Sequence, residues 1–299
     1  MSPNNSIGML FKNLEKTISN KEINIVSPKN DFIPFAKEDI QKNVVEKFKE
    51  IVKQHGEKIA IRINDKSCSY KELDRISDLL CQKIKEMNNI KQRGVALISS
   101  YSIEMIISII AILKSGKYYV PFDMNLPLNR MQFIINEAEC DIIICSKGNE
   151  HIVDALSNDV EKDFKRILFE EIQLLEGDVR EDNSLEISYN DIAYILYTSG
   201  TTGNPKGVAQ KHEYIMQLID IYTKQAHICC EDNLSQLASY SFSASVIDIF
   251  GALLNGATLC PYEVKEFGVV AFPNFVNNNS ISVLHMFPND CQPNLRIYP

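Results

Sequence analysis

The chain has 299 residues, of which 31 are basic and 39 acidic, giving a formal net charge of −8. Hydrophobic residues make up 45% and charged residues 23%, which excludes disordered, collagen-like and low-complexity chains. This length predicts roughly two domains' worth of material, with a core that needs no disulfide or metal to stabilise it. The acidic balance disfavours a nucleic-acid partner, but it does not exclude a phosphate ligand, because phosphate sites depend on local backbone amides.

In chain order, helical and strand patterns alternate after an entry segment of residues 1–38. A serine at position 69 followed by Glu72 fits a capping box that opens a helix, and Gly116 is expected just after the end of another. The alternation predicts an α/β fold with a largely parallel sheet. In the first half, the expected elements are a helix over 40–55, a strand over 58–63, a helix over 70–88, a strand over 94–98, a helix over 103–114, a strand over 118–120, a helix over 128–138 and a strand over 142–145. A charged surface connection with a weak strand at 167–169 is expected over 146–190. Beyond it we expect a strand over 192–197, helices over 213–226 and 244–254, a strand over 258–259, a helix over 272–277 and a strand over 281–286.

No targeting or membrane segment is expected. The N-terminus lacks a basic region followed by an apolar one, so no signal peptide is predicted. The most apolar stretch, Met105–Leu113, is too short to span a bilayer. The eight cysteines form no CxxC pair, and several, such as Cys145, lie in apolar runs. We therefore expect buried free thiols in a reducing compartment and a cytoplasmic location.

The most informative segment is Tyr197–Gly207, which follows an apolar strand and contains glycines, hydroxyl side chains and one lysine. Glycines let backbone N–H groups curl around an anion, hydroxyls add donors, and Lys206 adds a point charge suited to a polyphosphate. The spacing is neither that of a Walker A loop nor GxGxxG. From composition alone, a flexible hairpin without a ligand is the alternative.

Residues 192–208 closely resemble the phosphate-loop signature of adenylate-forming enzymes, the AMP-binding superfamily, and are most similar to adenylation domains of nonribosomal peptide synthetases. Residues 68–73 and 113–123 resemble two structural elements of the same family. The resemblance implies the N-terminal part of the adenylate-forming fold, with layered, mostly parallel sheets flanked by helices. It also implies that the loop holds the ATP pyrophosphate, through Thr198, Ser199, Gly200, Thr201, Thr202, Gly203 and Lys206.

Residues 240–258 resemble the family's substrate-side element, in which an aspartate pairs with the α-ammonium group of an amino acid. Ser243 stands at that position, and a hydroxyl cannot compensate a buried ammonium charge. Either the substrate lacks an α-amino group or the pocket is degenerate. Asp248 matches a different acidic position of the family and is expected to be an ordinary polar helix residue. The resemblance implies a tentative pocket of His212, Ser243, Ala244, Ile247 and His285.

The resemblance covers about residues 40–288, a little over the front half of such an enzyme. We expect an entry segment over 1–38, a partial adenylation domain over 39–288 and an irregular tail over 289–299, with the C-terminal lid domain absent. The family's adenine, ribose and carboxylate contacts find no match, so no catalytic set is complete and no metal ligand is assigned.

The function implied is ATP-dependent carboxylate activation: an acyl-adenylate forms and its acyl group passes to a carrier-protein thiol. ATP, Mg²⁺ and phosphopantetheine on a partner carrier protein are the implied cofactors, and a carboxylic acid is the substrate. We expect the chain to be truncated and weak or inactive alone, with a carrier protein or a complementary half-domain as partner. Two alternatives stay open, namely an acyl-CoA or aryl-acid ligase fragment, which Ser243 favours, and a non-catalytic partner-binding half-domain.

Overall fold

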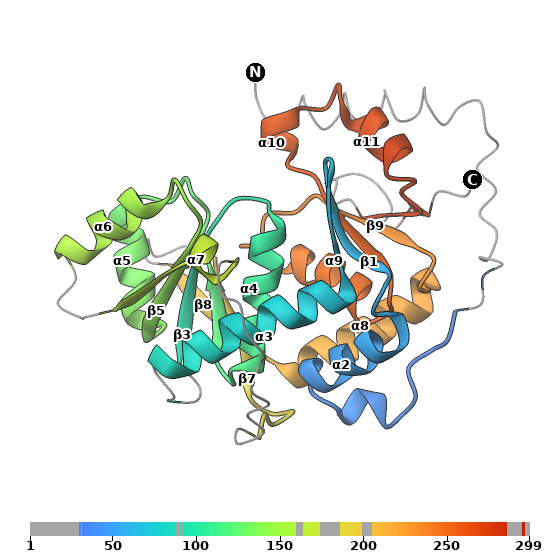
Figure 1. Cartoon of the computed structure of the whole chain (residues 1–299), viewed down its shortest axis with the longest axis horizontal. Coiled ribbons are helices and arrows are strands. Elements are labelled where there is room, and N and C mark those ends of the chain that lie inside the picture. Colours follow the sequence, from blue (N-terminus) through green and yellow to red (C-terminus); the bar gives the residue numbers. More distant parts are fainter. Residues whose placement is uncertain are drawn as a thin grey trace.

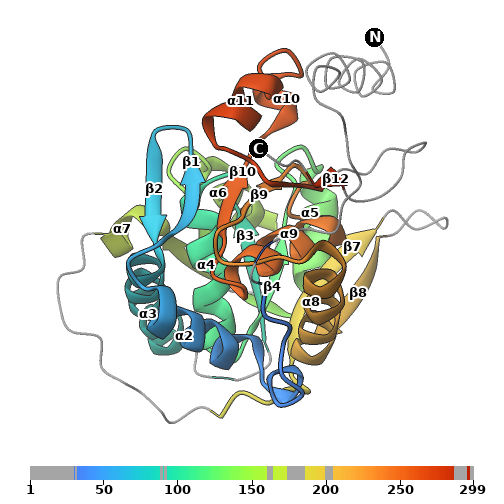
Figure 2. The ribbon, with the colours of Figure 1, turned by 90° about the vertical axis from the view of Figure 1, so that its right-hand side faces the viewer.

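The computed structural model describes residue 30, residues 32–87, residue 90 and residues 93–159, 164–173, 186–198, 205–285 and 295–296. Two six-stranded sheets form its framework, with helices between and around them (Figure 1). A second view, turned by a quarter, shows helices α2, α3 and α4 beside one another below the hairpin of β1 and β2 (Figure 2). The expectation of an α/β fold with mostly parallel sheets is confirmed.

The first sheet carries the candidate phosphate segment. Its strand order is β6-β5-β3-β4-β7-β8, and every neighbouring pair is parallel except β7 and β8, which are antiparallel. The strands are β3 (Gly94–Ile98), β4 (Tyr118–Pro121), β5 (Cys140–Cys145), β6 (Lys165–Leu168), β7 (Ile192–Thr198) and β8 (Lys206–Lys211).

The second sheet has the order β12-β11-β9-β10-β1-β2, with parallel pairing at its centre and an antiparallel pair at each edge. Its strands are β1 (Ile59–Ile63), β2 (Lys66–Ser69), β9 (Asn233–Gln236), β10 (Thr258–Pro261), β11 (Val283–Leu284) and β12 (Leu295–Arg296). Strand β1 pairs with β10 through Ile61 and Leu259, so the beginning and the end of the described chain share one sheet.

Helices fill the space between the sheets and cover their outer faces (Figure 1). Alternate residues of β3 face opposite ways, as expected for a strand: Val95 lies in a core with α3 and α4, whereas Ala96 lies in a second core with α5 and α6. The helices are η1 (Asp39–Gln41, a 3₁₀ turn), α2 (Val44–His55), α3 (Tyr70–Met87), α4 (Ile103–Lys114), α5 (Leu128–Glu137), α6 (Glu150–Asp159), α7 (Phe169–Gln173), α8 (His212–Ala226), α9 (Ser243–Leu253), α10 (Val264–Phe267) and α11 (Phe272–Asn278).

Local sequence signals explain several boundaries. The predicted capping box is present, because the Ser69 N–H donates to Glu72 Oε2 at 2.8 Å and the Glu72 N–H donates to Ser69 Oγ at 3.2 Å. Gly116 follows α4 with a φ of 71°, the left-handed backbone that favours glycine after a helix. Helix α4 is apolar on all sides because both of its faces are buried.

Other elements differ from the sequence-based expectation. The predicted surface connection over 146–190 contains two helices that were not expected, α6 and α7, among its described residues, whereas β6 overlaps the weak strand expected at 167–169. Strand β9 was not expected, because its buried Ser235 and Gln236 give no apolar alternation. Of the tail expected to be irregular, the structure describes Leu295 and Arg296, which pair with β11 as β12.

Two further expectations concern thiols and membrane segments. Within the described residues the cysteines are free, and Cys68, Cys81, Cys140, Cys145 and Cys260 are buried, as expected. Among the helices of the described residues, none is long and apolar enough to cross a membrane. The cytoplasmic location stays a prediction.

Candidate functional site

The candidate phosphate segment joins β7 to β8 at the edge of the first sheet. Thr198 ends β7 and Lys206 begins β8, and the two residues face each other in the antiparallel register. Both side chains are exposed. The register therefore brings the first and last residues of the predicted phosphate set together. The other five predicted residues, Ser199, Gly200, Thr201, Thr202 and Gly203, lie outside the described residues.

The base of this hairpin is closely packed. A Cβ atom on Gly207 would lie 3.0 Å from Tyr197 Cζ and 3.1 Å from Ile195 Cγ2, so the glycine lets β8 approach β7. Burial, and next a hydrogen bond with Glu137, raise the pKa of the Tyr197 hydroxyl well above its usual value of 10.0. A neutral, packed tyrosine thus fixes the strand just before Thr198.

The predicted pocket residues on α9 share the first turns of that helix. Ser243 is the first residue of α9 and is exposed, next to Phe242, which is 64% exposed. Ala244 is buried and Ile247 is half-buried one turn further on. Ser243 and Ile247 are four residues apart, so they lie on one face of α9. The structure therefore places these three predicted residues together at one helix end.

His285 joins this group through a residue that the sequence analysis treated as an ordinary polar one. His285 Nδ1 lies 2.8 Å from Asp248 Oδ1, and the side chains are 6% and 2% exposed. Burial raises the pKa of Asp248 from its usual 3.8 to about 6, although the bond to His285 lowers it. Asp248 is thus a buried acid that contacts a predicted pocket residue. The sequence signal for it was an acidic residue inside the apolar run of α9.

His212 lies at the end of β8 opposite to Lys206. It begins α8, directly after Lys211, and Lys211 is roughly 17 Å from Lys206 by the rise of a strand. The side chain is 1% exposed, and the Val44 N–H donates to its Nδ1 at 3.3 Å. His212 therefore accepts a hydrogen bond from the first residue of α2. Its role in a substrate pocket stays a prediction.

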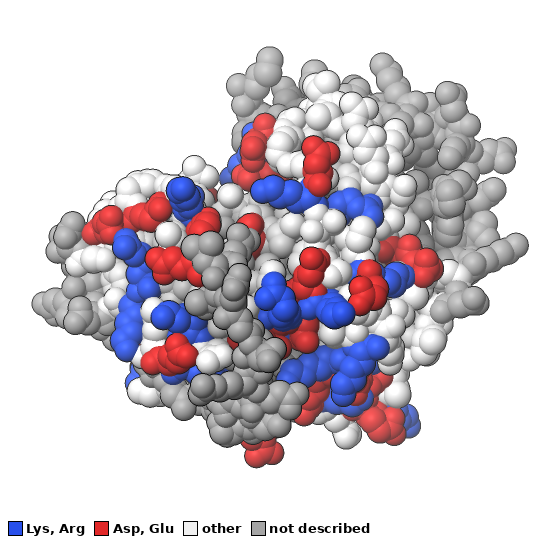
Figure 3. Space-filling view, viewed as in Figure 1, with Lys and Arg blue, Asp and Glu red and all other residues white. Residues whose placement is uncertain are grey.

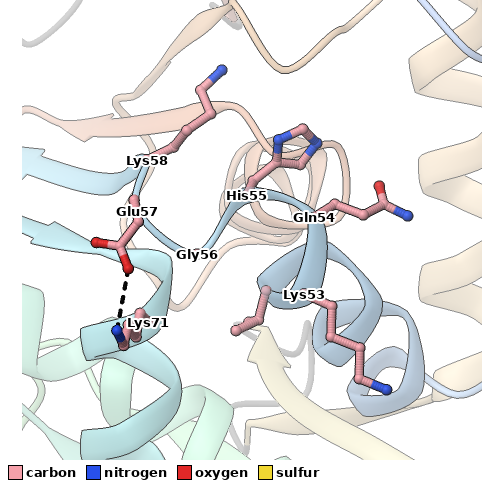
Figure 4. Close-up of a pocket in the computed structure, with 8 residues that line it drawn as sticks. Lys53, Gln54, His55, Gly56, Glu57, Lys58 and Lys71 are labelled. Atoms are coloured by element: carbon pink, nitrogen blue, oxygen red, sulfur yellow. Dashed lines mark hydrogen bonds and ion pairs between the residues drawn. The ribbon is translucent and has the colours of Figure 1, made fainter.

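A separate cavity of about 490 Å³ lies at the turn between α2 and β1. Figure 4 shows Lys53 and Lys58 pointing in opposite directions and Lys71 paired with Glu57. Lys58 Nζ lies 2.8 Å from Glu231 Oε1. Because carboxylates balance two of its lysines, this cavity is not an evident anion site, and it contains none of the predicted site residues.

On the face of the molecule in Figure 3, acidic side chains lie beside basic ones over much of the described surface. The same described residues contain no group of three His, Cys, Asp or Glu side chains placed to hold a metal ion. The described part of the site therefore supplies hydroxyls and a lysine rather than a cage of metal ligands.

Comparison with known proteins gives a consistent assignment. A model of the AMP-binding enzyme family matches residues 48–291. Tyrocidine synthase 1 of Brevibacillus parabrevis is 31% identical over 261 residues, covering 86% of this chain and 23% of that protein. Gramicidin S synthase 1 of Brevibacillus brevis is 31% identical over 252 residues, covering 83% of this chain and 22% of that protein.

Solved structures agree with these relatives. The Klebsiella oxytoca NpsA N-terminal subdomain, in complex with 3-hydroxybenzoyl-AMSN, superposes with a TM-score of 0.71 at 26% identity, covering 82% of this chain and 60% of that chain. An artificially fused adenylation–PCP di-domain, NpsA-ThdA, also gives a TM-score of 0.71, at 25% identity over 82% of this chain and 48% of that one. The chain spans less than a quarter of the length of tyrocidine synthase 1 and of gramicidin S synthase 1. It belongs to the AMP-binding enzyme family, its homologues include adenylation domains of nonribosomal peptide synthetases, and its fold is that of the N-terminal subdomain of adenylate-forming enzymes.

Proposed function

We propose that this chain acts in ATP-dependent activation of a carboxylic acid. A carboxylate oxygen attacks the α-phosphorus of ATP, an oxygen–phosphorus bond forms, and the bond to the leaving pyrophosphate breaks. The acyl group of the resulting acyl-adenylate then passes to the phosphopantetheine thiol of a carrier protein, and AMP leaves. The observation that carries the proposal is the match of the AMP-binding family over residues 48–291, together with the pairing of Thr198 with Lys206 at the two ends of the predicted phosphate segment.

The residues at the hairpin have the chemistry that pyrophosphate needs. Lys206 and Thr198 are partners in the antiparallel register, and the side chains of both are exposed. Backbone N–H groups of residues 199–203 would add donors, by the predicted role of this segment. Mg²⁺ would neutralise charge on the phosphates, and we assign its coordination mainly to the nucleotide, as is usual for Mg²⁺ with phosphates.

The proposed acyl pocket differs at one position from that of the amino-acid-activating members of the family, so either its acid lacks an α-amino group or the pocket is degenerate. Ser243 replaces the carboxylate that would pair with an α-ammonium group, so the first turn of α9 offers no charge for it. Structures of NpsA carry 3-hydroxybenzoyl and anthranilyl analogues, which have no α-amino group. An aryl acid is therefore the second substrate class to test beside amino acids. A carrier-protein partner is supported by the adenylation–PCP fusion of that relative.

Titration calorimetry with MgATP tests the proposal. Lys206→Ala removes the positive charge at the start of β8, and we expect at least tenfold weaker binding of MgATP, as for the loss of a charge-assisted hydrogen bond. Lys211→Ala is the matched control, because Lys211 is also exposed on β8 but at its far end. Equal affinity in the two variants, or no binding by the wild-type chain, would contradict the proposal.

A further inference from the structure

Helix α8 carries apolar side chains on two of its faces. The face that packs into the core is made of Ile215, Met216, Ile219 and Tyr222, all of which are buried. A surface helix needs only one such stripe, with polar side chains on the opposite face. In α8, however, Tyr214 is 38% exposed, Ile221 is 53% exposed and Leu218 is half-buried. These three residues are outside the buried face and are called the α8 stripe below.

The α8 stripe is continuous along the helix. Its members are four and then three residues apart, which places them on one face over two turns of α8. The helix lies at the front of the molecule in Figure 2, where no described helix or strand is drawn over it. Single exposed apolar residues are ordinary on a protein surface. An aligned set on an outward helix face is instead typical of a surface that docks a partner.

Helix α2 shows an outward helix face without such a stripe in the same chain. Its core face is apolar, and its exposed side chains are all polar, namely Glu46, Lys49, Lys53 and Gln54. Both helices are amphipathic and lie at the surface of the described structure. The outward apolar stripe is therefore a property of α8 itself and not of every surface helix in this chain.

The charges beside the α8 stripe indicate which partner fits it. Glu213 lies in the first turn of α8 and Lys224 in the last. They are eleven residues apart, about three turns at 3.6 residues per turn, so they lie on the same flank of the stripe. A second α8 laid antiparallel would bring each glutamate beside the lysine of the other copy. A parallel arrangement would bring like charges together, which is unfavourable.

The apolar side chains are self-complementary in the same arrangement. With a two-fold axis near Leu218, Tyr214 of each copy meets Ile221 of the other. The glutamate–lysine pairs have their centre at nearly the same position along α8. Such an isologous contact uses one surface twice and closes after two copies. The apolar contacts and the charge pairs thus call for one and the same antiparallel register.

We propose that the α8 stripe is a dimerisation surface, on which a second copy of this chain docks with its own α8 antiparallel and related by a two-fold axis. The stripe contains none of the residues predicted for the phosphate segment or the acyl pocket, so this inference does not depend on the proposed function. One helix from each copy makes a small interface, and we therefore expect a micromolar dissociation constant.

Sedimentation velocity on the full chain over about 1–100 μM tests the proposal. The wild-type chain should pass from monomer to dimer in this range. Ile221→Glu places a charge in the stripe of both copies and should weaken the dimer at least about tenfold. Tyr214→Ser, which removes an aromatic contact, should also weaken it. Val270→Glu is the matched control, because Val270 is apolar, 84% exposed and located between α10 and α11, away from α8 (Figure 1).

Charge reversal tests the antiparallel register. Glu213→Lys and Lys224→Glu should each weaken the dimer, by roughly threefold to tenfold, because each places like charges at both ends of the contact. The double variant should recover most of the lost affinity. The two positions are roughly 16 Å apart along one helix by its rise per residue. Recovery can therefore arise only between two copies, and a role of either residue in its own helix would not produce it.

Three results would overturn the proposal. The first is a wild-type chain that stays monomeric at every concentration, including one that instead binds a different protein through α8. The second is a dimer that Ile221→Glu and Val270→Glu weaken equally. The third is a double charge variant that dimerises no better than the single ones. Circular dichroism of each variant shows that it is folded before its association is compared.

Discussion

His212 is a buried polar residue, and its hydrogen bond indicates how much stability its removal would cost. It is buried at the start of α8, and its Nδ1 accepts the Val44 N–H at the first turn of α2. In His212→Ala this N–H loses its acceptor in a buried position, which costs about 1–3 kcal/mol. We expect that drop in the free energy of unfolding by denaturant titration. A change below about 0.5 kcal/mol, the usual range for an inert surface site, would show that the contact with α2 contributes little.

Asp248 should make the stability depend on pH. Its pKa is about 6 in the folded chain and 3.8 ordinarily, so between these values the folded state binds the proton more tightly. The contribution of this tighter proton binding to the free energy of unfolding is therefore complete below about pH 4 and is lost as the pH rises through about 6. Asp248→Asn has no such proton, so the wild-type chain should lose up to about 3 kcal/mol relative to the variant over this interval. Unfolding titrations at each pH measure the difference, and a constant or rising difference would contradict the assignment.

At the scale of single elements, Lys114 connects two core helices. At the end of α4, its Nζ lies 2.6 Å from Asp74 Oδ1 and 2.7 Å from Asp78 Oδ1, both on α3, and its side chain is 3% exposed. Lys114→Met leaves two carboxylates without this cation, and we expect a loss of about 2–3 kcal/mol, moderated by the partial exposure of the aspartates.

Lys71→Met is the control for that variant, because the Lys71–Glu57 pair is 3.2 Å long and both side chains are largely exposed. A surface pair of this kind contributes at most about 0.5 kcal/mol. Chemical denaturation of both variants provides the comparison. Equal losses would show that burial does not decide the contribution of the Lys114 contacts.

How well each element could be predicted depends on whether its local signals agree. The strand at Gly94–Ile98 and the helix at Ile103–Lys114 are confirmed at both ends, since composition, capping and apolar runs all indicate the same boundaries. Strand β9 was missed because Ser235 and Gln236 are polar and yet fully buried. Such a strand owes its place to pairing with β10 and β11, which local sequence does not reveal.

The candidate site shows the same division. The signature over 192–208 is contiguous, so its residues could be named from the sequence, and the pairing of Thr198 with Lys206 agrees with a loop at that place. The contact of Asp248 with His285 joins residues 37 positions apart and depends on how α9 packs against β11. Residue spacing along the sequence therefore could not predict this contact, and Asp248 was interpreted as an ordinary polar residue.

At the scale of the whole molecule, the alternation of helices and strands predicted parallel pairing but not the division into two sheets. That division requires β1 to pair with β10, across nearly the whole described chain. Strands β7 and β8, which carry Thr198 and Lys206, are the edge pair of the first sheet. Helix α9 and His285, which follows β11, belong with the second sheet. Carboxylate activation would therefore need phosphate-binding groups from one sheet and acyl-binding groups from the other.

Hydrogen–deuterium exchange with and without MgATP tests most directly whether the chain binds nucleotide through the β7–β8 hairpin. We predict slower exchange in peptides that cover residues 197–207, with little change in peptides that cover the cavity between α2 and β1. Lys206→Ala should remove the protection, and Lys211→Ala should retain it. Protection confined to another part of the chain, or none at saturating nucleotide, would contradict the account.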